Sequence, residues 1–194
     1  MPRQGLNRAS VVEAAVSMIE EAGVASFSMA ELAKRLNVKT ASLYNHVSGM
    51  EDLLTEVGLN AVGRMAQCER DAIEGKRGEQ ALSALAEAYR AFAKDHHELY
   101  RVIMNIQKSH NSVLELEAGE IIGPIDQVLQ DYGLSETGRQ HWQRVLRSVM
   151  HGFAAHEKAG GFSHYPVERS ESYRIAIECI SGGLKAAGKD EYNG

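Results

Sequence analysis

Apolar residues recur at helical spacing along most of the chain. Val12, Ala15, Ile19 and Ala22 lie at positions i, i+3, i+7 and i+10, which predicts an amphipathic helix over about residues 8–22. Gly23 is expected to end this helix, because glycine commonly follows the last helical residue. The start of the chain is therefore expected to be helical.

Two short helices separated by a tight turn follow. Ser28 is the expected N-cap of a helix over residues 29–36, because Glu31 stands three residues later, as in a capping box. Asn37 can adopt the left-handed conformation that ends a helix. A third helical pattern then runs from Thr40 to Val47.

The remaining pattern predicts longer helices. A second Ser-x-x-Glu box, Ser48 to Glu51, predicts the start of a fourth helix that links two parts of the chain. Beyond a break at Glu74 to Gly78, the apolar spacing predicts five more helices, near residues 79–95, 97–108, 112–132, 136–157 and 170–187. Gly123-Pro124 is expected to kink the third of these five, since proline lacks an amide donor.

No segment has the alternation of a β-strand, so the expected fold class is all-α with about nine helices. A chain of 194 residues is near the size at which one domain gives way to two. We expect a small N-terminal three-helix domain at residues 1–50 and a larger C-terminal helical domain at residues 51–194.

Charge is unevenly distributed between these parts. The chain carries a net charge of -5, which by itself argues against nucleic-acid binding. Residues 1–50, however, hold five Lys and Arg against four acidic residues, so this part is slightly positive. Any DNA-binding face is therefore expected near the N-terminus.

The two cysteines, Cys68 and Cys179, lie far apart within helical patterns, which is typical of a reduced cytoplasm. The first residues lack the apolar core of a signal peptide, and no apolar run is long enough to cross a membrane. We expect a cytoplasmic protein that has no membrane partner.

The segment from Ser28 to Val47 has the pattern of a helix-turn-helix, in which the second helix enters the DNA major groove. An ordinary helical hairpin has the same spacing, so the spacing alone leaves both interpretations open. The identities of the residues favour DNA binding: they are Ala14-Ala15, Gly23, Leu32-Ala33, Val38, Leu43-Tyr44-Asn45-His46-Val47 and Leu53-Leu54.

Together these residues resemble the DNA-binding domain of the tetracycline-repressor (TetR/AcrR-like) family, without a gap from residue 7 to about 55. The resemblance implies a recognition surface formed or flanked by Lys39, Thr40, Ala41, Ser42, Tyr44, Asn45 and His46. Thr40 and Ser42 can donate hydrogen bonds to bases or phosphates, and Asn45 can pair with adenine. Leu32, Leu36, Leu43 and Val47 are expected in the small core, and Tyr44 could belong partly to it.

Three positions depart from the family pattern. Lys39 stands at a common serine, Asn37 replaces the turn glycine, and Met50 lies where a lysine often contacts phosphate. Only the last departure weakens the argument for DNA binding, because it removes one phosphate contact and leaves base readout unchanged.

The C-terminal part resembles the family type named WHG, through His151-Gly152-Phe153, Ala159 to Phe162 and Ile180 to Leu184, although no tryptophan precedes His151. The resemblance implies a homodimer through the last two helices, a palindromic DNA operator and a pocket for a largely apolar small-molecule effector. The small residues Gly182, Gly183, Ala186 and Ala187 suit such an interface or packing within one subunit. The candidate ligand-binding residues are Tyr89, Phe92, Tyr100, Met104, Trp142, Met150 and His151, and for each of them plain core packing is the favoured alternative.

The implied function is that of a repressor released from DNA by its effector. A metal-sensing regulator and a helical protein-binding module are the alternatives. A metal site would need histidines at ligand spacing. The histidines of the C-terminal part do not have this spacing: His96, His97, His110, His141, His151 and His156. The chain also has no phosphate-binding loop and no nucleophile elbow, so we expect no catalytic residues, no cofactor and no metal site.

Overall fold

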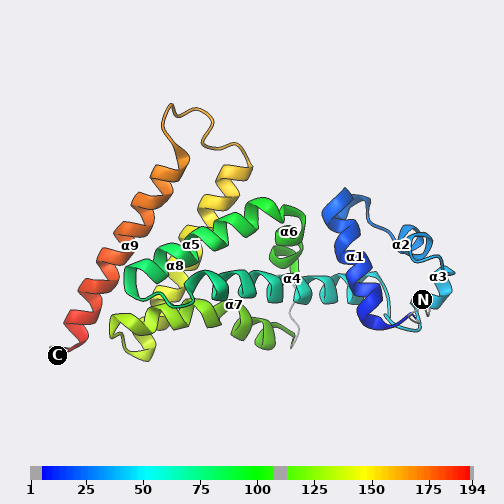
Figure 1. The fold of residues 1–194 in the computed structure, drawn as a ribbon, viewed down its shortest axis with the longest axis horizontal. Helices are drawn as coiled ribbons and strands as arrows, with labels where there is room; N and C mark the ends of the chain where they lie inside the picture. The colour runs from blue at the N-terminus through cyan, green and yellow to red at the C-terminus, as the bar shows by residue number, and fades with distance from the viewer. Residues whose placement is uncertain (1–5, 107–112, 193–194) are drawn as a thin grey trace. The chain divides into compact units, whose positions relative to one another are not determined.

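A computed structural model describes residues 6–106 and 113–192, and within this part the chain forms nine α-helices, two short 3-10 helices and no strand. The predicted all-α class is confirmed (Figure 1). In chain order the elements are α1 (Arg8–Ala22), η1 (Val24–Ser26), α2 (Met29–Arg35), α3 (Thr40–Leu43), α4 (Met50–Ile73), α5 (Gly78–Asp95), α6 (His97–Ile106), α7 (Val113–Leu129), η2 (Gln130–Tyr132), α8 (Glu136–Lys158) and α9 (Arg169–Tyr192). The predicted ends of two helices at residues 107–108 and 112, and the candidate His110, lie outside the described residues.

The helices form two compact units. The first comprises residues 1–64 and 96–117, and the second comprises residues 65–95 and 118–194. The first unit extends beyond the predicted N-terminal domain because α6 packs against α1. The functional boundary near residue 50 stays a prediction. No helix in the described ranges is both long and apolar enough to span a membrane.

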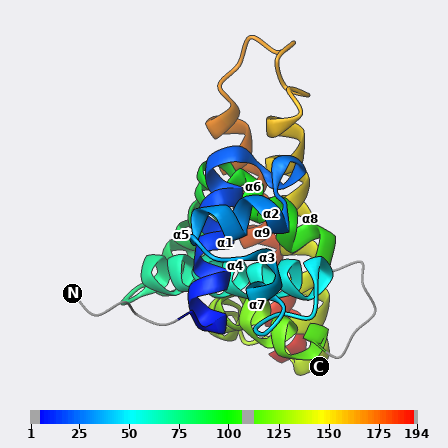
Figure 2. The same cartoon turned by 90° about the vertical axis from the view of Figure 1, so that its right-hand side faces the viewer.

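Local signals in the first unit act as predicted. Gly23, with a φ of 82°, follows the last residue of α1, and the Ser28 side chain accepts a hydrogen bond from the Glu31 backbone N–H at 3.2 Å. Asn37 has a φ of 53°, so it adopts the predicted left-handed conformation between α2 and α3. These residues fix the tight turn of the helix-turn-helix formed by α2 and α3, which Figure 2 shows with α1 at the front of the view.

Several boundaries differ from the prediction: α7 ends at Leu129 rather than near residue 132, α9 ends at Tyr192 rather than near residue 187, and two boundaries near the recognition segment also change. Helix α3 ends at Leu43 rather than Val47, and the backbone hydrogen bond from His46 N–H to Leu43 O marks a tighter turn. Ser48 does not form a box with Glu51; its N–H and hydroxyl instead donate to Asp52, at 2.7 and 2.9 Å. Helix α4 accordingly begins at Met50.

Helix α6 is attached to the end of α1 by polar contacts. The Glu98 carboxylate accepts a hydrogen bond from the Val24 backbone N–H at 3.1 Å, and this bond is the main cause of a lowered pKa for Glu98. His96 Nδ1 lies 2.6 Å from a carboxylate oxygen of Glu20 in α1. The contacts hold the backbone after α1, from which α2 and α3 follow.

In the second unit, α5, α8 and α9 pack on one another. Tyr173 of α9 is fully buried and donates its hydroxyl hydrogen to Ala86 O of α5 at 2.8 Å. The Arg90 guanidinium donates to both carboxylate oxygens of Glu157 in α8, at 2.9 and 2.8 Å. A buried hydrogen bond and a largely buried ion pair therefore connect the three helices.

A carboxyl group lies within the apolar face of α4 in the same unit. Glu69 is only 2% exposed, and the buried residues Met65, Ala66 and Ile73 share its helix face. Burial raises the pKa of Glu69 to about 8, although the charges of Arg147 and Arg70 oppose this shift. Below that pH the group is protonated in the folded chain.

The buried Glu69 predicts that stability falls as pH rises. Between the ordinary pKa of 4.5 and about 8, the unfolded chain releases this proton while the folded chain retains it. The free energy of unfolding of the wild type, measured by urea titration and compared with that of Glu69→Gln, should therefore fall by up to about 1.4 kcal/mol per pH unit in this window. Parallel pH profiles for the two proteins would contradict the assignment.

Candidate nucleic-acid interface

Helices α2 and α3 pack through a small apolar core. Leu32, Ala33, Leu43 and Val47 are buried, while Leu36 is only half-buried. Buried side chains at Leu43 and Val47 place the intervening residues toward solvent, because they lie on the other side of the turn. The structure therefore separates packing residues from candidate contact residues within this short segment.

The seven residues predicted to contact DNA are accessible to different degrees. Lys39, Thr40, Ala41, Tyr44 and Asn45 are exposed, and Ser42 and His46 are half-buried. Tyr44 is 54% exposed, so most of its ring lies outside the small core. The segment thus presents one ammonium, several hydroxyls, an amide and an imidazole, which are groups that bind phosphates and base edges.

Arg8 connects the three chain segments that surround this surface. Its guanidinium donates to the His46 backbone carbonyl at 2.7 Å, to an Asp52 carboxylate oxygen at 2.9 Å and to a Glu56 carboxylate oxygen at 2.7 Å. The His46 carbonyl is therefore bonded by a side chain from α1. The two carboxylates raise the pKa of Arg8 further above its usual range.

Asp52 shares the contact with Arg8 and also fixes the start of α4. Hydrogen bonds from the Ser48 backbone N–H and then from Arg8 lower the pKa of Asp52. A carboxylate in the first turn of a helix also interacts favourably with the helix dipole. Asp52 therefore positions the chain directly after the recognition segment.

Few positive charges remain available around this segment. Arg35 is paired with Glu21 through contacts of 2.6 and 2.7 Å, and Lys34 lies 3.8 Å from a Glu31 carboxylate oxygen. Lys39, in contrast, has no ion-pair partner among the described residues. The positive charge that is not paired within this segment therefore lies on Lys39, at the start of α3.

Two protein-family models match this chain. The family model described as "Bacterial regulatory proteins, tetR family" matches residues 11–57, which include α2, α3 and every candidate contact. A second model, described as "Tetracyclin repressor-like, C-terminal domain", matches residues 82–180. The chain belongs to the tetR family of bacterial regulatory proteins. It is a transcriptional regulator with a helix-turn-helix DNA-binding segment.

Relatives of this tetR-family regulator are similar over most of their length. An uncharacterized HTH-type transcriptional regulator, YobS of Bacillus subtilis, is 31% identical over 153 residues, which are 78% of this chain and 79% of YobS. A solved structure of a Rhodococcus protein of unknown function has a TM-score of 0.81 at 20% identity, over 95% of this chain and 98% of that one. The structure of BioQ with its double-stranded DNA operator has a TM-score of 0.67 at 18% identity, over 94% and 99% of the two chains. The WHG subtype is not distinguished by these descriptions and stays a prediction.

The candidate ligand-binding residues of the regulator are divided between the two units. Tyr100 and Met104 belong to the first unit, and Tyr89, Phe92, Trp142, Met150 and His151 belong to the second. Four of the seven are buried, namely Tyr89, Phe92, Tyr100 and Met150, while Met104 and Trp142 are half-buried and His151 is exposed. Their role in effector binding stays a prediction.

The histidines of the metal-sensor alternative can be placed in part. His96 faces Glu20, and His97 Nε2 lies 3.9 Å from a Glu98 carboxylate oxygen. Among the residues that the structure describes, no group of three or more His, Cys, Asp or Glu side chains is arranged to hold a metal ion. The alternative therefore gains no structural support.

Sequence reasoning missed the residues that position the interface. Arg8, Asp52 and Glu98 were not singled out, because their partners are backbone groups whose positions depend on the fold. Only the four-residue spacing of Ser48 and Asp52 is a local signal that could have identified one of these contacts.

The Arg8 contacts predict that Arg8→Gln destabilises the recognition segment. Loss of the hydrogen bond to the His46 carbonyl and of two carboxylate contacts should lower the free energy of unfolding by roughly 1 kcal/mol. Amide hydrogen exchange over residues 40–49 should become faster. Arg35→Gln is the matched control, because it removes an ion pair of similar exposure, with Glu21, that makes no bond to the backbone of residues 40–49. Equal exchange in the two variants would contradict the role of Arg8.

Proposed function

We propose that the chain is a homodimeric repressor that binds a palindromic operator and is released by a small-molecule effector. The exposed surface from Lys39 to His46 is the observation that carries the proposal. Its polar groups surround Tyr44, whose ring is exposed and lies mostly outside the core. Regulation by an effector is typical of the tetR family. In this proposal the protein acts in the cytoplasm and its activity is binding rather than catalysis.

Two uncharged stripes support the proposed dimer. One stripe on α8 consists of exposed or half-buried residues that are alternately four and three positions apart: His141, Val145, Ser148, Gly152 and Ala155. On α9, the exposed residues Ser172, Ile175, Cys179, Gly182 and Ala186 have the same type of spacing. Val145 and Ile175 are 44% and 49% exposed. Such stripes are expected where helices of two subunits pack together.

The four small residues predicted for the interface have different surroundings. A Cβ atom on Gly183 would lie 2.6 Å from Trp142 Cη2, so Gly183 is needed for packing within the subunit. Gly182 has no neighbouring atom within 4 Å of such a Cβ, and Ala186 is exposed. Ala187 is half-buried, so Gly182 and Ala186 are the most accessible members of this set.

Two-fold symmetry would place one recognition segment from each subunit in successive major grooves, as helix-turn-helix dimers require. BioQ was solved with its double-stranded operator, and the similar fold of that protein supports DNA docking through the corresponding segment. A fragment from the region upstream of the regulator's own gene is the first DNA to test. Binding that weakens as salt rises would distinguish DNA binding from a protein-binding module, because only the former must release phosphate counterions.

Tyr44→Ala should weaken binding to such a fragment by roughly 1–3 kcal/mol in fluorescence anisotropy, because the ring lies on the exposed recognition surface. Circular dichroism should be unchanged, since Tyr44 contributes little to the core. Tyr165→Ala is the control, as Tyr165 is 65% exposed and belongs to the second unit. Unaltered affinity in Tyr44→Ala would exclude the proposed surface.

Ile175→Glu should shift the protein from dimer to monomer in size-exclusion chromatography with light scattering. A carboxylate at the centre of the α9 stripe would have to be desolvated on association, which costs several kcal/mol without a partner. Val167→Glu is the control, because Val167 is 62% exposed but lies outside both stripes. If Ile175→Glu remains as dimeric as the wild type, the dimer uses another surface.

A further inference from the structure

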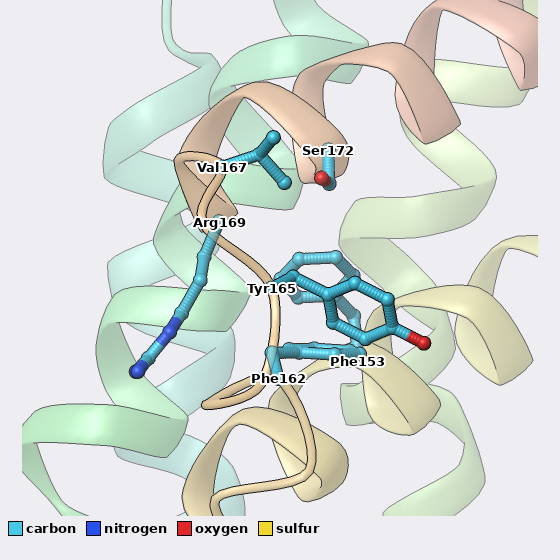
Figure 3. A pocket seen from close by; sticks show the side chains of 6 residues that line it. All are labelled: Phe153, Phe162, Tyr165, Val167, Arg169 and Ser172. Carbon is cyan, nitrogen blue, oxygen red and sulfur yellow. The ribbon is translucent and has the colours of Figure 1, made fainter.

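A hollow of about 290 Å³ opens in the second unit where the chain turns from α8 to α9 (Figure 3). It is lined by Phe153 of α8, by Phe162, Tyr165 and Val167 of the connecting segment, and by Arg169 and Ser172 of α9. None of these six residues was a candidate ligand-binding residue in the sequence.

The base of the hollow is built from fixed aromatic rings. The Phe153 ring lies 4.8 Å from the Phe162 ring and 4.8 Å from that of Tyr173, measured between centroids. The Arg90 guanidinium lies 5.4 Å from the Phe153 centroid, and Glu157 holds Arg90 from the other side. Phe153 is therefore packed on three sides, and the aromatic surface exists without a ligand.

The turn that carries Phe162 is also well defined. Gly160 has a φ of 74°, and the Gly161 N–H donates to His156 O at 2.8 Å. A Cβ atom on Gly161 would lie 3.2 Å from the same carbonyl oxygen, so glycine allows the close approach. The Ser163 hydroxyl donates to Gly160 O at 2.6 Å. These contacts fix one wall of the hollow.

The rim leaves apolar surface open to solvent. Tyr165 and Val167, at 65% and 62% exposed, are the two most exposed large apolar side chains in the described part of the chain. In Figure 3 the rings of Phe153, Phe162 and Tyr165 lie together, with Val167 and Ser172 beyond them and Arg169 along one side.

The lining holds one basic side chain, that of Arg169, and its positive charge contributes, after the hydrogen bond from Arg90, to the lowered pKa of the nearby Glu157 carboxylate. Arg169 has no hydrogen-bond or ion-pair partner among the described residues. The nearby Glu157 carboxylate has both oxygens bonded to Arg90, and Glu171 is paired with Arg174. The lining contains no carboxylate, and the Ser172 hydroxyl adds a hydrogen-bond donor.

We propose that this hollow, defined as the α8–α9 pocket, binds a compact aromatic carboxylate, with its ring on Phe153, Phe162 and Tyr165 and its carboxylate on Arg169. The volume is at the lower end of that of small-molecule sites, which suits one ring with a short acidic chain. A guanidinium binds a carboxylate through charge-assisted hydrogen bonds and so distinguishes acids from their neutral analogues. The site requires no DNA, and of its lining residues only Ser172 also belongs to the α9 stripe of the proposed dimer.

Isothermal titration calorimetry on the full chain tests the proposal with three probes that differ only in the end group, 4-phenylbutyrate, 4-phenylbutanol and 4-phenylbutylamine. The acid should bind, the alcohol should bind at least about tenfold more weakly, and the amine should give no heat. Arg169→Ala should weaken binding of the acid about tenfold or more, the effect of losing one charge-assisted contact of about 1.4 kcal/mol. Tyr165→Ala should weaken the acid and the alcohol alike, because it removes ring contact.

Arg174→Ala is the matched control, because Arg174 lies on the same helix and its guanidinium is occupied by Glu171 and Glu178. Its affinity for the acid should equal that of the wild type. The proposal is overturned if the acid gives no heat, if the alcohol binds as tightly as the acid, or if Arg169→Ala binds the acid unchanged. Urea titration verifies that each variant is folded. The assay contains no DNA, so its failure would leave the proposed operator binding unaffected.

Discussion

The hydrogen bonds of Arg8 are the interaction on which the DNA-facing segment depends. Helix α3 has only four residues, and a helix of that length is not stable by itself in water. Its position must come from tertiary contacts, and Arg8 supplies them by connecting the start of α1 to the His46 carbonyl and to Asp52 at the start of α4. The buried Leu43 and Val47 provide the apolar part of the same anchoring.

The elements that could be predicted are those whose causes are local in sequence. Helix α1 extends over the predicted residues, and α8 over one residue more at its end, because apolar periodicity suffices to define them. The anchoring of the chain after α3 could not be predicted, since the His46 carbonyl is bonded by an arginine 38 positions earlier in the chain. Glu69 is similar: only the packing of α4 shows that this polar residue lies on a buried face.

One of the two candidate sites could be predicted from local sequence, and the other depends on tertiary packing. The exposed residues of the recognition segment could be named from the motif, because the positions of Leu43 and Val47 determine which neighbours face solvent. The α8–α9 pocket could not be predicted from the sequence. Phe162, Tyr165 and Val167 lie in a turn without periodicity, and they meet Phe153 only after α8 and α9 have packed. The attachment of α6 through Glu98 also depends on a backbone N–H that no sequence pattern identifies.

The ion pairs near the recognition segment reduce the positive charge that is available to bind DNA phosphates. Arg8 and Arg35 are held by carboxylates, so of the basic residues around the recognition segment Lys39 is the one placed to meet phosphate. A single segment of this kind gains little from counterion release, which grows with the number of phosphates neutralised. Two segments in one dimer would make the second contact intramolecular and so raise the affinity without further charge. An effector would then need only to alter the separation of the two segments, because each segment alone would bind weakly.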